Sequence, residues 1–243
     1  MCKVLVVIGA SSDIGMAFIE KYGQEYEKIA VFYRHSNEKL EALLAKYKEG
    51  SILRVKCDFA GEEGYYNLWD KKEAMQNFCS QAQIYIVHFP ASPIKNKKYH
   101  KSDWKEFQEE VDISVKSFVI CSQYFLPMMI KQENGRIVVC LSKAVEGEPP
   151  KYCADYVMVK YALLGLVRSL AVEYGDRGLR INAVSPAMVD TKFLVYQPEV
   201  IINGWKDQSK SGELLSPGVV ADKIAWLFSK EAEDINGKNF VVE

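Results

Sequence analysis

The sequence predicts an α/β fold in which seven short, mainly parallel strands form one sheet with helices on both faces. Short runs rich in Val and Ile alternate with longer segments of helical periodicity along the whole 243-residue chain. Most of these runs are continuously apolar, which is typical of parallel strands buried on both faces. The length suits one large domain of this kind, so we expect residues 1–243 to form a single domain.

Each expected element follows from its local pattern. The strands are expected at 3–8, 28–33, 51–56, 83–88, 136–141, 179–184 and 239–242. The helices between them are expected at 13–24, 37–48, 62–81, 102–132, 153–174 and 218–229. Right-handed crossovers between such units give a doubly wound fold of the Rossmann type. The stretch at about 187–217 is irregular, and we expect it to cover a substrate; a poorly ordered insertion is the alternative.

Composition and charge exclude several classes of function. The net charge of −1, with both signs spread along the chain, gives no reason to expect nucleic acid or an anionic membrane as a partner. Six cysteines without a CxxC pair and three scattered histidines predict neither a metal site nor a disulfide framework. The apolar runs are too short to span a bilayer, and the N-terminus has no signal-peptide layout. We therefore expect a cytoplasmic protein.

A turn of small residues separates the first strand from the first helix. It reads Gly9-Ala10-Ser11-Ser12-Asp13-Ile14-Gly15. Backbone amides of such a turn, at a helix N-terminus, can bind the pyrophosphate of a dinucleotide. Gly9 permits the tight turn and Gly15 permits close packing of the helix on the strand. Similar turns also occur without a ligand, but this one follows the first strand of a β-α-β unit, where the dinucleotide motif lies.

The end of the second strand indicates which dinucleotide is preferred. The sequence there is Phe32-Tyr33-Arg34-His35-Ser36-Asn37, without the acidic residue that binds the ribose hydroxyl in NAD-dependent dehydrogenases. Arg34 and Ser36 can instead bind a 2′-phosphate, so we expect NADP(H) to be favoured over NAD(H). The alternative is a solvated loop in which Ser36 or Asn37 caps the next helix. Asp58, after the third strand, is equally open: it can bind an adenine amino group or cap the helix near Glu62.

Three polar residues converge on the crevice expected at the strand ends. Tyr156 and Lys160 lie four residues apart, on one face of the helix after the fifth strand. A nearby cation favours the phenolate, so we expect the tyrosine pKa to be lowered from about 10, which suits a general acid or base. Ser142 ends the fifth strand, where its hydroxyl can hydrogen-bond a carbonyl oxygen. A serine in such a turn is more often structural, and Tyr-x-x-x-Lys arises easily by chance, so only the combination indicates catalysis.

These signals occur in an order that resembles the short-chain dehydrogenase/reductase family over almost the whole chain. The matching segments are 9–15, Cys57-Asp58, 135–142, Tyr156 to Lys160, 178–187 and Ile235-Asn236-Gly237-Lys238. The branch that looks most similar contains ketoacyl-carrier-protein reductases and related carbonyl reductases. The resemblance implies an oxidoreductase that transfers hydride between a nicotinamide and a carbonyl or alcohol. Reduction of an apolar, acyl or polyketide-like ketone is the favoured direction.

The resemblance also implies a role for each matching residue. Tyr156 passes a proton to the substrate carbonyl, Lys160 holds the ribose hydroxyls and biases the tyrosine, and Ser142 orients the carbonyl oxygen. The cofactor is expected to contact Ser12, Ile14 and Arg34 at its phosphates, Val189 and Thr191 at its nicotinamide amide, and Gly9, Ser11, Gly15, Ser36, Asp58, Phe59, Phe89 and Pro186 elsewhere. The segment 193–215 is expected to cover the substrate.

Several departures from the family pattern bear on activity. Asp13 replaces the middle glycine of the first turn, and His88-Phe89-Pro90-Ala91 replaces Asn-Asn-Ala-Gly after the fourth strand. Ser114 takes the place of the asparagine that holds a proton-relay water, and its hydroxyl can join a water chain in a different way. Ala187 replaces a glycine after the sixth strand, and the final Asp-Gly-Gly is absent. A weakly active or inactive subunit that pairs with an active homologue is therefore the alternative to an active reductase.

The helices expected at 102–132 and 153–174 carry apolar residues on more than one face, for example Phe118, Phe125 and Leu163. Family members pack these helices against their copies, so the resemblance implies a homodimer or homotetramer, with a hetero-oligomer containing a homologue as the alternative. Burial of both faces within one chain would also explain the pattern.

Overall fold

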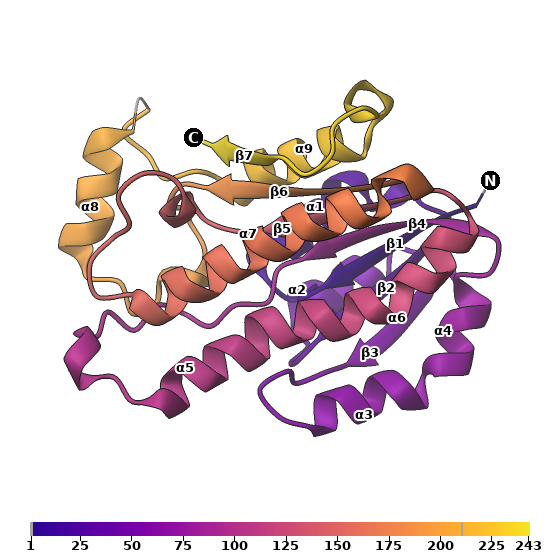
Figure 1. Ribbon diagram of the computed structural model, residues 1–243, viewed down its shortest axis with the longest axis horizontal. Helices are drawn as coiled ribbons and strands as arrows, with labels where there is room; N and C mark the ends of the chain where they lie inside the picture. Colours follow the sequence, from indigo (N-terminus) through magenta and orange to yellow (C-terminus); the bar gives the residue numbers. More distant parts are fainter. Residues whose placement is uncertain (1, 210) are drawn as a thin grey trace.

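The computed structural model describes residues 2–209 and 211–243, and its centre is one seven-stranded sheet (Figure 1). The strands are β1 (Cys2–Ile8), β2 (Lys28–Tyr33), β3 (Ile52–Lys56), β4 (Ala82–His88), β5 (Gly135–Cys140), β6 (Leu179–Pro186) and β7 (Asn239–Val242). Their order is β3-β2-β1-β4-β5-β6-β7, and every neighbouring pair is parallel. The predicted doubly wound Rossmann fold is confirmed, and the sheet is parallel throughout rather than mainly parallel.

Helices cover both faces of the sheet (Figure 1). One face packs against α3 (Glu63–Asp70), α4 (Lys72–Phe78), α6 (Ser117–Lys131) and α7 (Ala154–Tyr174). The other face packs against α1 (Asp13–Tyr22), α2 (Glu38–Leu44) and α9 (Pro217–Phe228). Two further helices, α5 (Trp104–Glu110) and α8 (Glu199–Gln208), lie at the end of the molecule toward which the strands point. That end is where a parallel sheet places its ligand crevice.

Alternation along the strands supplies apolar side chains to both layers. In β1, Val4, Val6 and Ile8 face the layer of α6 and α7, whereas Leu5 and Val7 face the layer of α1 and α9. All five side chains are at most 1% exposed. Each contributes about 1.5–3 kcal/mol of transfer free energy. The core therefore fixes the strand positions, and with them the side chains at the strand ends.

Two predicted segments differ in detail from the structure. The helix expected at 62–81 is two helices, α3 and α4, because Lys71 between them has a ψ of 6°, outside the helical range. The stretch at 187–217, expected to be irregular, contains α8. Asn203 and Gly204 are poor helix formers inside α8, and they weaken its signal in the sequence.

The helix expected at 102–132 begins at Trp104, where Asp103 and Glu106 form a capping box. It also contains a π-helical turn, η3 (Val111–Lys116), between α5 and α6. A π turn inserts one extra residue and rotates the side chains on either side relative to each other. Such turns are frequent at functional sites, and this one includes Ser114.

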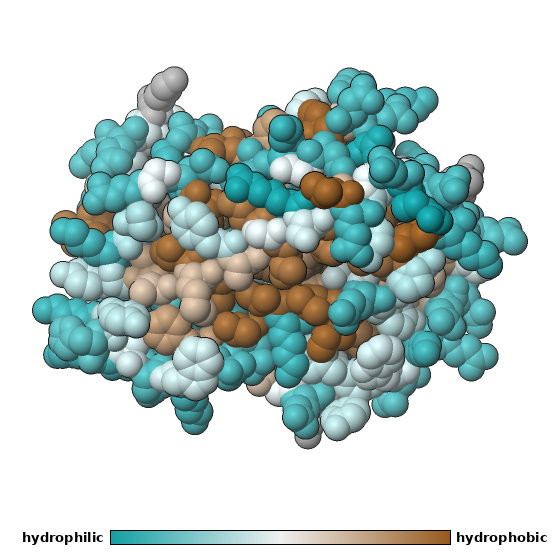
Figure 2. All heavy atoms as spheres, in the orientation of Figure 1, coloured by the Kyte–Doolittle hydropathy of each residue, from teal (hydrophilic) through white to brown (hydrophobic). Residues whose placement is uncertain are grey.

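The combined helix Trp104–Lys131 is 28 residues long, and by length and composition it is apolar enough to cross a membrane. The sequence did not predict a helix of this length and apolarity, because its continuous apolar runs are short. Half of its most apolar stretch is buried within the protein, where Phe118, Phe125 and Met129 pack against the sheet. Apolar side chains also form a band across the surface of this face of the molecule (Figure 2).

Candidate functional site

The carboxyl ends of the central strands bring the predicted site segments to one edge of the sheet. Strand register places Ile8 of β1 beside His88 of β4, and His88 beside Val139 of β5. Phe89 continues the pairing by donating its N–H to the Ile8 carbonyl at 3.0 Å. The first turn, the run after β4 and Ser142 after β5 therefore emerge side by side.

Ser142, Tyr156 and Lys160 meet at this edge. Ser142 has extended backbone two residues after β5, and its Oγ accepts a hydrogen bond from the Ala144 N–H at 3.2 Å. Tyr156 and Lys160 lie in the first two turns of α7, and the Ser142 hydroxyl lies near enough to the Tyr156 phenol to lower its pKa. Lys160 Nζ lies 5.5 Å from the Tyr156 ring centroid and donates to the Cys140 carbonyl at 2.9 Å.

Burial controls the ionisation of this group. Tyr156 is 7% exposed, and burial raises the pKa of its phenol, an effect that the Ser142 hydroxyl partly reverses. The expected lowering of the Tyr156 pKa is therefore wrong, because desolvation dominates. Lys160 is 2% exposed, and burial lowers the pKa of its ammonium group. A neutral phenol is the form that can donate a proton, so the arrangement suits a general acid.

The first turn has a shape that only small residues allow. Gly9 has a φ of +83°, and a Cβ at this position would lie 3.2 Å from the Cβ of Phe89. A Cβ on Gly15 would lie 2.9 Å from the Gly9 carbonyl oxygen. Ser12 caps α1, since its Oγ donates to the Gly9 carbonyl at 2.8 Å and accepts from the Gly15 N–H at 3.1 Å. The backbone is thereby held open toward the crevice.

Backbone N–H groups at the start of α1 are available to an anion. Within residues 2–209 and 211–243, the N–H groups of Ser11, Asp13 and Ile14 have no hydrogen-bond acceptor. They lie at the positive end of the helix dipole. The turn therefore fits a dinucleotide pyrophosphate. The Ser12 hydroxyl is occupied by the turn itself, so backbone groups rather than this side chain are the available donors.

Asp13 contacts a segment that is distant in sequence. Its Oδ2 accepts a hydrogen bond from the backbone N–H of Lys192 at 2.8 Å. Lys192 follows Thr191, whose Oγ1 donates to the Val189 carbonyl at 3.3 Å. The carboxylate thus joins the first turn to the two residues expected at the nicotinamide amide. Its charge is directed toward a backbone donor.

The structure of the loop after β2 bears on the two functions predicted for it, binding of a 2′-phosphate and capping of the next helix. Asn37 caps α2 by accepting a backbone N–H of that helix at 2.9 Å. Ser36 donates its hydroxyl to the carboxylate of Glu41, which also binds Arg54. Arg34 is exposed at the end of β2. The capping alternative therefore holds for Asn37, and Arg34 is an exposed cation directly after β2.

The remaining predicted cofactor residues lie at the same strand-end edge. The exposed Asp58 carboxylate accepts the Ala60 N–H at 3.1 Å and closes a turn, whereas α3 has no side-chain cap. Phe59 and Phe89 are buried in opposite layers of the core, and Pro186 ends β6. Phe59 and Phe89 therefore contribute packing beneath the crevice.

A second group of polar side chains is buried beside Lys160. Ser114, in η3, is fully buried. His88 is also fully buried, with Nε2 2.9 Å from Ser117 Oγ, and burial together with Lys160 lowers the pKa of His88 to about 3. Glu110, one helical turn before Ser114, is 4% exposed. Sequence reasoning did not identify Glu110; its only signal was its spacing of four residues from Ser114.

The segment after β6 covers Tyr156. The ring centroids of Phe193 and Tyr156 lie 5.9 Å apart. Ile94, from the run after β4, packs against the same small cluster. Gln197 Nε2 donates to the Ile94 carbonyl at 3.2 Å and joins the two covering segments. The predicted catalytic tyrosine therefore lies beneath residues of the segment expected to cover a substrate.

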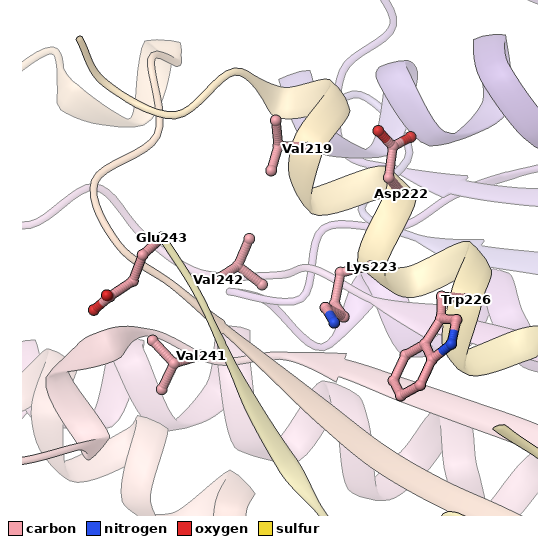
Figure 3. Close-up of a pocket in the computed structure, with 7 residues that line it drawn as sticks. All are labelled: Val219, Asp222, Lys223, Trp226, Val241, Val242 and Glu243. Carbon is pink, nitrogen blue, oxygen red and sulfur yellow. The ribbon is translucent and has the colours of Figure 1, made fainter. Parts of the chain in front are cut away.

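Two surface hollows lie apart from this group. One, of about 350 Å³ beside β7 and α9, is lined by Val219, Asp222, Lys223, Trp226, Val241, Val242 and Glu243 (Figure 3). The other, of about 460 Å³, is lined by Lys97, Lys98, Tyr99, His100, Lys151, Tyr152 and Ala154. Neither is lined by the Ser142, Tyr156 and Lys160 group. Among the residues that the structure describes, no cluster of three or more His, Cys, Asp or Glu side chains is arranged to hold a metal ion.

Known proteins resemble this chain along nearly its whole length. A family model described as enoyl-(acyl carrier protein) reductase matches residues 9–243. Glucose 1-dehydrogenase 2 of Bacillus subtilis is 25% identical over an alignment of 253 residues, which covers 99% of this chain and 93% of the relative. The solved structure of ElxO with NADP bound has a TM-score of 0.84 at 20% identity, and covers 100% of this chain and 97% of that chain. The structure of the 3-ketoacyl-(acyl-carrier-protein) reductase of Brucella melitensis, complexed with NADH, has a TM-score of 0.82 at 20% identity. The match covers 99% of this chain and 96% of that chain. The chain belongs to the short-chain dehydrogenase/reductase family of oxidoreductases.

Proposed function

We propose that this chain is an NADPH-dependent ketone reductase. The observation that carries the proposal is the grouping of the Ser142 hydroxyl, the Tyr156 phenol and the Lys160 ammonium group at one strand-end edge, with Lys160 Nζ 5.5 Å from the tyrosine ring centroid. Two neighbouring hydroxyl groups can both donate to a substrate carbonyl oxygen. Membership of a family of oxidoreductases supports hydride transfer as the reaction.

Each residue of the group has one task in this reaction. The nicotinamide, when bound, supplies hydride to the carbonyl carbon. Tyr156 donates its phenolic proton to the carbonyl oxygen as the C–H bond forms, and becomes a phenolate. Ser142 holds the same oxygen by a hydrogen bond. Lys160, fixed through the Cys140 carbonyl, stabilises the phenolate by its charge.

Arg34 supports NADPH rather than NADH as the cofactor. It is exposed at the end of β2, where an NAD-dependent enzyme has an acid for the ribose hydroxyl. The solved neighbours contain NADP in one case and NADH in the other, so the preference rests on this residue. A charge-assisted hydrogen bond contributes about 1.5–3 kcal/mol, so Arg34→Ala is expected to weaken NADPH binding at least about tenfold more than NADH binding.

Fluorescence titration with both cofactors measures this preference. Lys39→Ala, which removes another exposed cation from α2, is the matched control and is expected to change neither affinity. Equal losses of NADPH and NADH affinity in Arg34→Ala would remove Arg34 from phosphate recognition.

For the substrate we propose an apolar or acyl ketone. The tyrosine ring is covered by the apolar side chains of Phe193 and Ile94, which offer few partners for the hydroxyls of a polyol. The assay that tests this follows NADPH oxidation with simple ketones, 3-ketoacyl thioesters and aldoses. We expect turnover of the ketones and the thioesters but not of the aldoses. No turnover of any class, combined with no NADPH-induced shift in melting temperature, would favour an inactive subunit that pairs with a homologue.

We also propose that the chain is a cytoplasmic homodimer or homotetramer. Met158, Tyr161 and Val172 are 37%, 45% and 85% exposed along one stripe of α7, on the face that carries the apolar surface band (Figure 2). Exposed apolar side chains on one face of a helix are frequent at interfaces. Light scattering that shows only monomer at working concentrations would contradict the oligomer.

A further inference from the structure

Buried polar atoms without a protein partner gather in one part of the molecule. Within the described residues, seven buried side-chain N or O atoms lack a hydrogen-bond partner, and five of them belong to His88, Ser92, Asn96, Glu110 and Ser114. Leaving such an atom unsatisfied costs about 1–3 kcal/mol. Ordered water is the usual partner of buried groups of this kind. The five residues come from the end of β4, the run that follows it and the α5–η3 helix, and Lys160 acts on two of them, so we expect ordered water between these segments.

Glu110 is the ionisable group of this region that interacts with the active site. The charged or titratable groups around it are Asp155, Tyr156 and Lys160 from α7, Lys95 from the run after β4, and, through Lys95, Glu106 and Glu109 of its own helix. Burial has the largest effect and raises the pKa of Glu110 to about 6, while Ser92 and Lys160 oppose this shift. The carboxyl group can therefore hold or release a proton near neutral pH.

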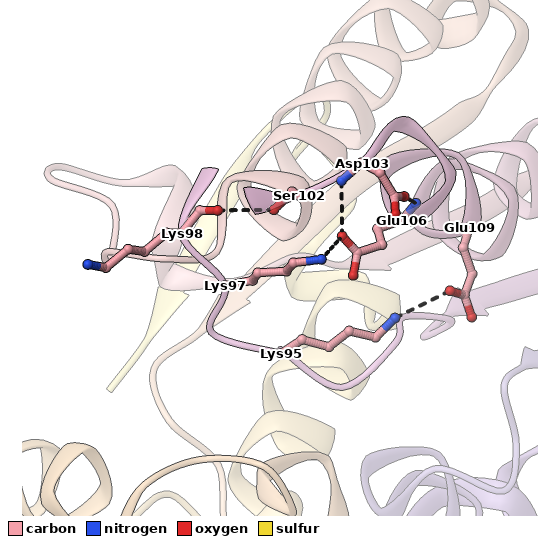
Figure 4. Close-up of polar contacts among 7 residues, drawn as sticks. All are labelled: Lys95, Lys97, Lys98, Ser102, Asp103, Glu106 and Glu109. Atoms are coloured by element: carbon pink, nitrogen blue, oxygen red, sulfur yellow. Dashed lines mark hydrogen bonds and ion pairs between the residues drawn. The ribbon is translucent and has the colours of Figure 1, made fainter. Parts of the chain in front are cut away.

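Ion pairs join the run after β4 to α5, the helix whose last residue is Glu110 (Figure 4). Lys97 Nζ donates to Glu106 Oε2 at 2.6 Å, and Lys95 Nζ donates to Glu109 Oε2 at 3.3 Å. These contacts fasten the run after β4 to α5. Glu110 is therefore buried on a helix that is fastened to its neighbour, and the carboxylate adjacent to it in the chain, Glu109, is exposed.

Lys160 can connect this region to the tyrosine. An ammonium group has three N–H donors, and the Cys140 carbonyl accepts only one of them. The charge of Lys160 acts on both Glu110 and His88. Ser117, which contacts His88, also donates to the Ser114 carbonyl at 3.2 Å. Two of the buried polar residues, His88 and Glu110, are therefore near enough to Lys160 for its charge to shift their pKa values.

We propose that Glu110 is a positioning residue that stores a proton and supplies it, through water and Lys160, to Tyr156. The inference rests on the proposed reductase function. After each reduction the Tyr156 phenolate takes a proton from Lys160, the Glu110 carboxyl group replaces that proton through water, and solvent reprotonates the carboxylate. One proton enters for each carbonyl reduced, while the hydride brings the electron pair, so the cycle balances. In alcohol oxidation the same groups carry the proton outward.

The pH dependence of kcat in Glu110→Gln tests the proposal. In the parent, the rate of ketone reduction is expected to fall as pH rises through the Glu110 ionisation, because the protonated carboxyl group is the donor. Glu110→Gln is expected to lose this inflection, to lower kcat about tenfold and to raise the solvent deuterium isotope effect, while KM for NADPH stays within about twofold. Glu110→Asp is expected to keep an inflection, moved to a different pH, and to recover part of kcat.

Glu73→Gln is the control, since it removes an exposed carboxylate from α4, which the proposed proton path does not include, and it should leave kcat and its pH profile unchanged. A Glu110→Gln enzyme with the parent profile and isotope effect would overturn the proposal, as would a loss confined to KM. If Glu110→Gln does not fold, an unmoved inflection in Glu110→Asp overturns it.

Infrared difference titration of the parent gives a test that needs no turnover. A protonated carboxyl band that disappears around pH 6 and is missing in Glu110→Gln or shifted in Glu110→Asp is expected. A parent without turnover would refute the proposed reductase, whereas an absent carboxyl band would refute the role of Glu110 alone.

Discussion

Replacement of Tyr156 by Phe removes one oxygen atom and tests the whole catalytic assignment. General acid catalysis contributes about 10²–10⁴-fold, which corresponds to about 2.7–5.5 kcal/mol of activation free energy. The interaction with Ser142 that is lost contributes at most about 0.5–1.5 kcal/mol to the free energy of unfolding, and Ser142 keeps its contact with the Ala144 N–H. In a chain of this length that loss lowers the melting temperature by no more than about 6 °C. We therefore expect kcat to fall at least about 100-fold in a protein that stays folded.

The assay combines NADPH oxidation with a ketone and thermal melting with and without NADPH. Tyr161→Phe is the matched control: this tyrosine is 45% exposed on the same helix, and its variant should keep the parent rate. The NADPH-induced shift in melting temperature should be the same in both variants and the parent, since the aromatic ring remains. Parent-level turnover by Tyr156→Phe would show that another group supplies the proton.

Three further outcomes follow from the packing around the site. Gly15→Ala places a Cβ 2.9 Å from a backbone oxygen, so it should lower the free energy of unfolding by about 1–3 kcal/mol and reduce the NADPH-induced shift in melting temperature. The control is Gly61→Ala, whose Cβ would have no atom within 4 Å and which should change neither quantity. Burial lowers the pKa of His88 to about 3, so below about pH 6.5 the unfolded chain binds a proton that the folded chain does not. Urea titrations should therefore show that the free energy of unfolding decreases by up to about 1.4 kcal/mol for each unit by which the pH drops below about 6.5. The same slope in His88→Asn would place its origin elsewhere. Phe193→Ala uncovers Tyr156 and should raise KM for apolar ketones about tenfold with little change in NADPH binding, and an unchanged KM would show that Phe193 does not contact substrate.

Strand positions were the most predictable feature of this chain. The predicted and observed bounds coincide for β2 and β7, because each is a compact apolar run flanked by polar residues. Ser142, Tyr156 and Lys160 also lie together as predicted, since parallel strand ends share one edge and helical spacing fixes the pair on α7.

Features that depend on contacts between distant segments were not predictable from local pattern. The break at Lys71 is a backbone angle set where α3 and α4 dock separately on the sheet. The raised pKa of Tyr156 follows from burial beneath Phe193, which lies 37 positions further along the chain. Glu110 looks like any surface glutamate of a charged helix, and only the packing of α5 against α7 reveals that it is buried.

The hydrogen bond from Lys192 to Asp13 spans 179 positions of the sequence and joins the first turn to the segment that covers Tyr156. Its carboxylate belongs to the turn whose free N–H groups fit a pyrophosphate, and its donor belongs to the segment that continues into Phe193. Any displacement of that segment from the tyrosine would strain or break a bond anchored at the turn that fits the pyrophosphate. We therefore expect binding at one end of the crevice to alter the free energy of opening the other end.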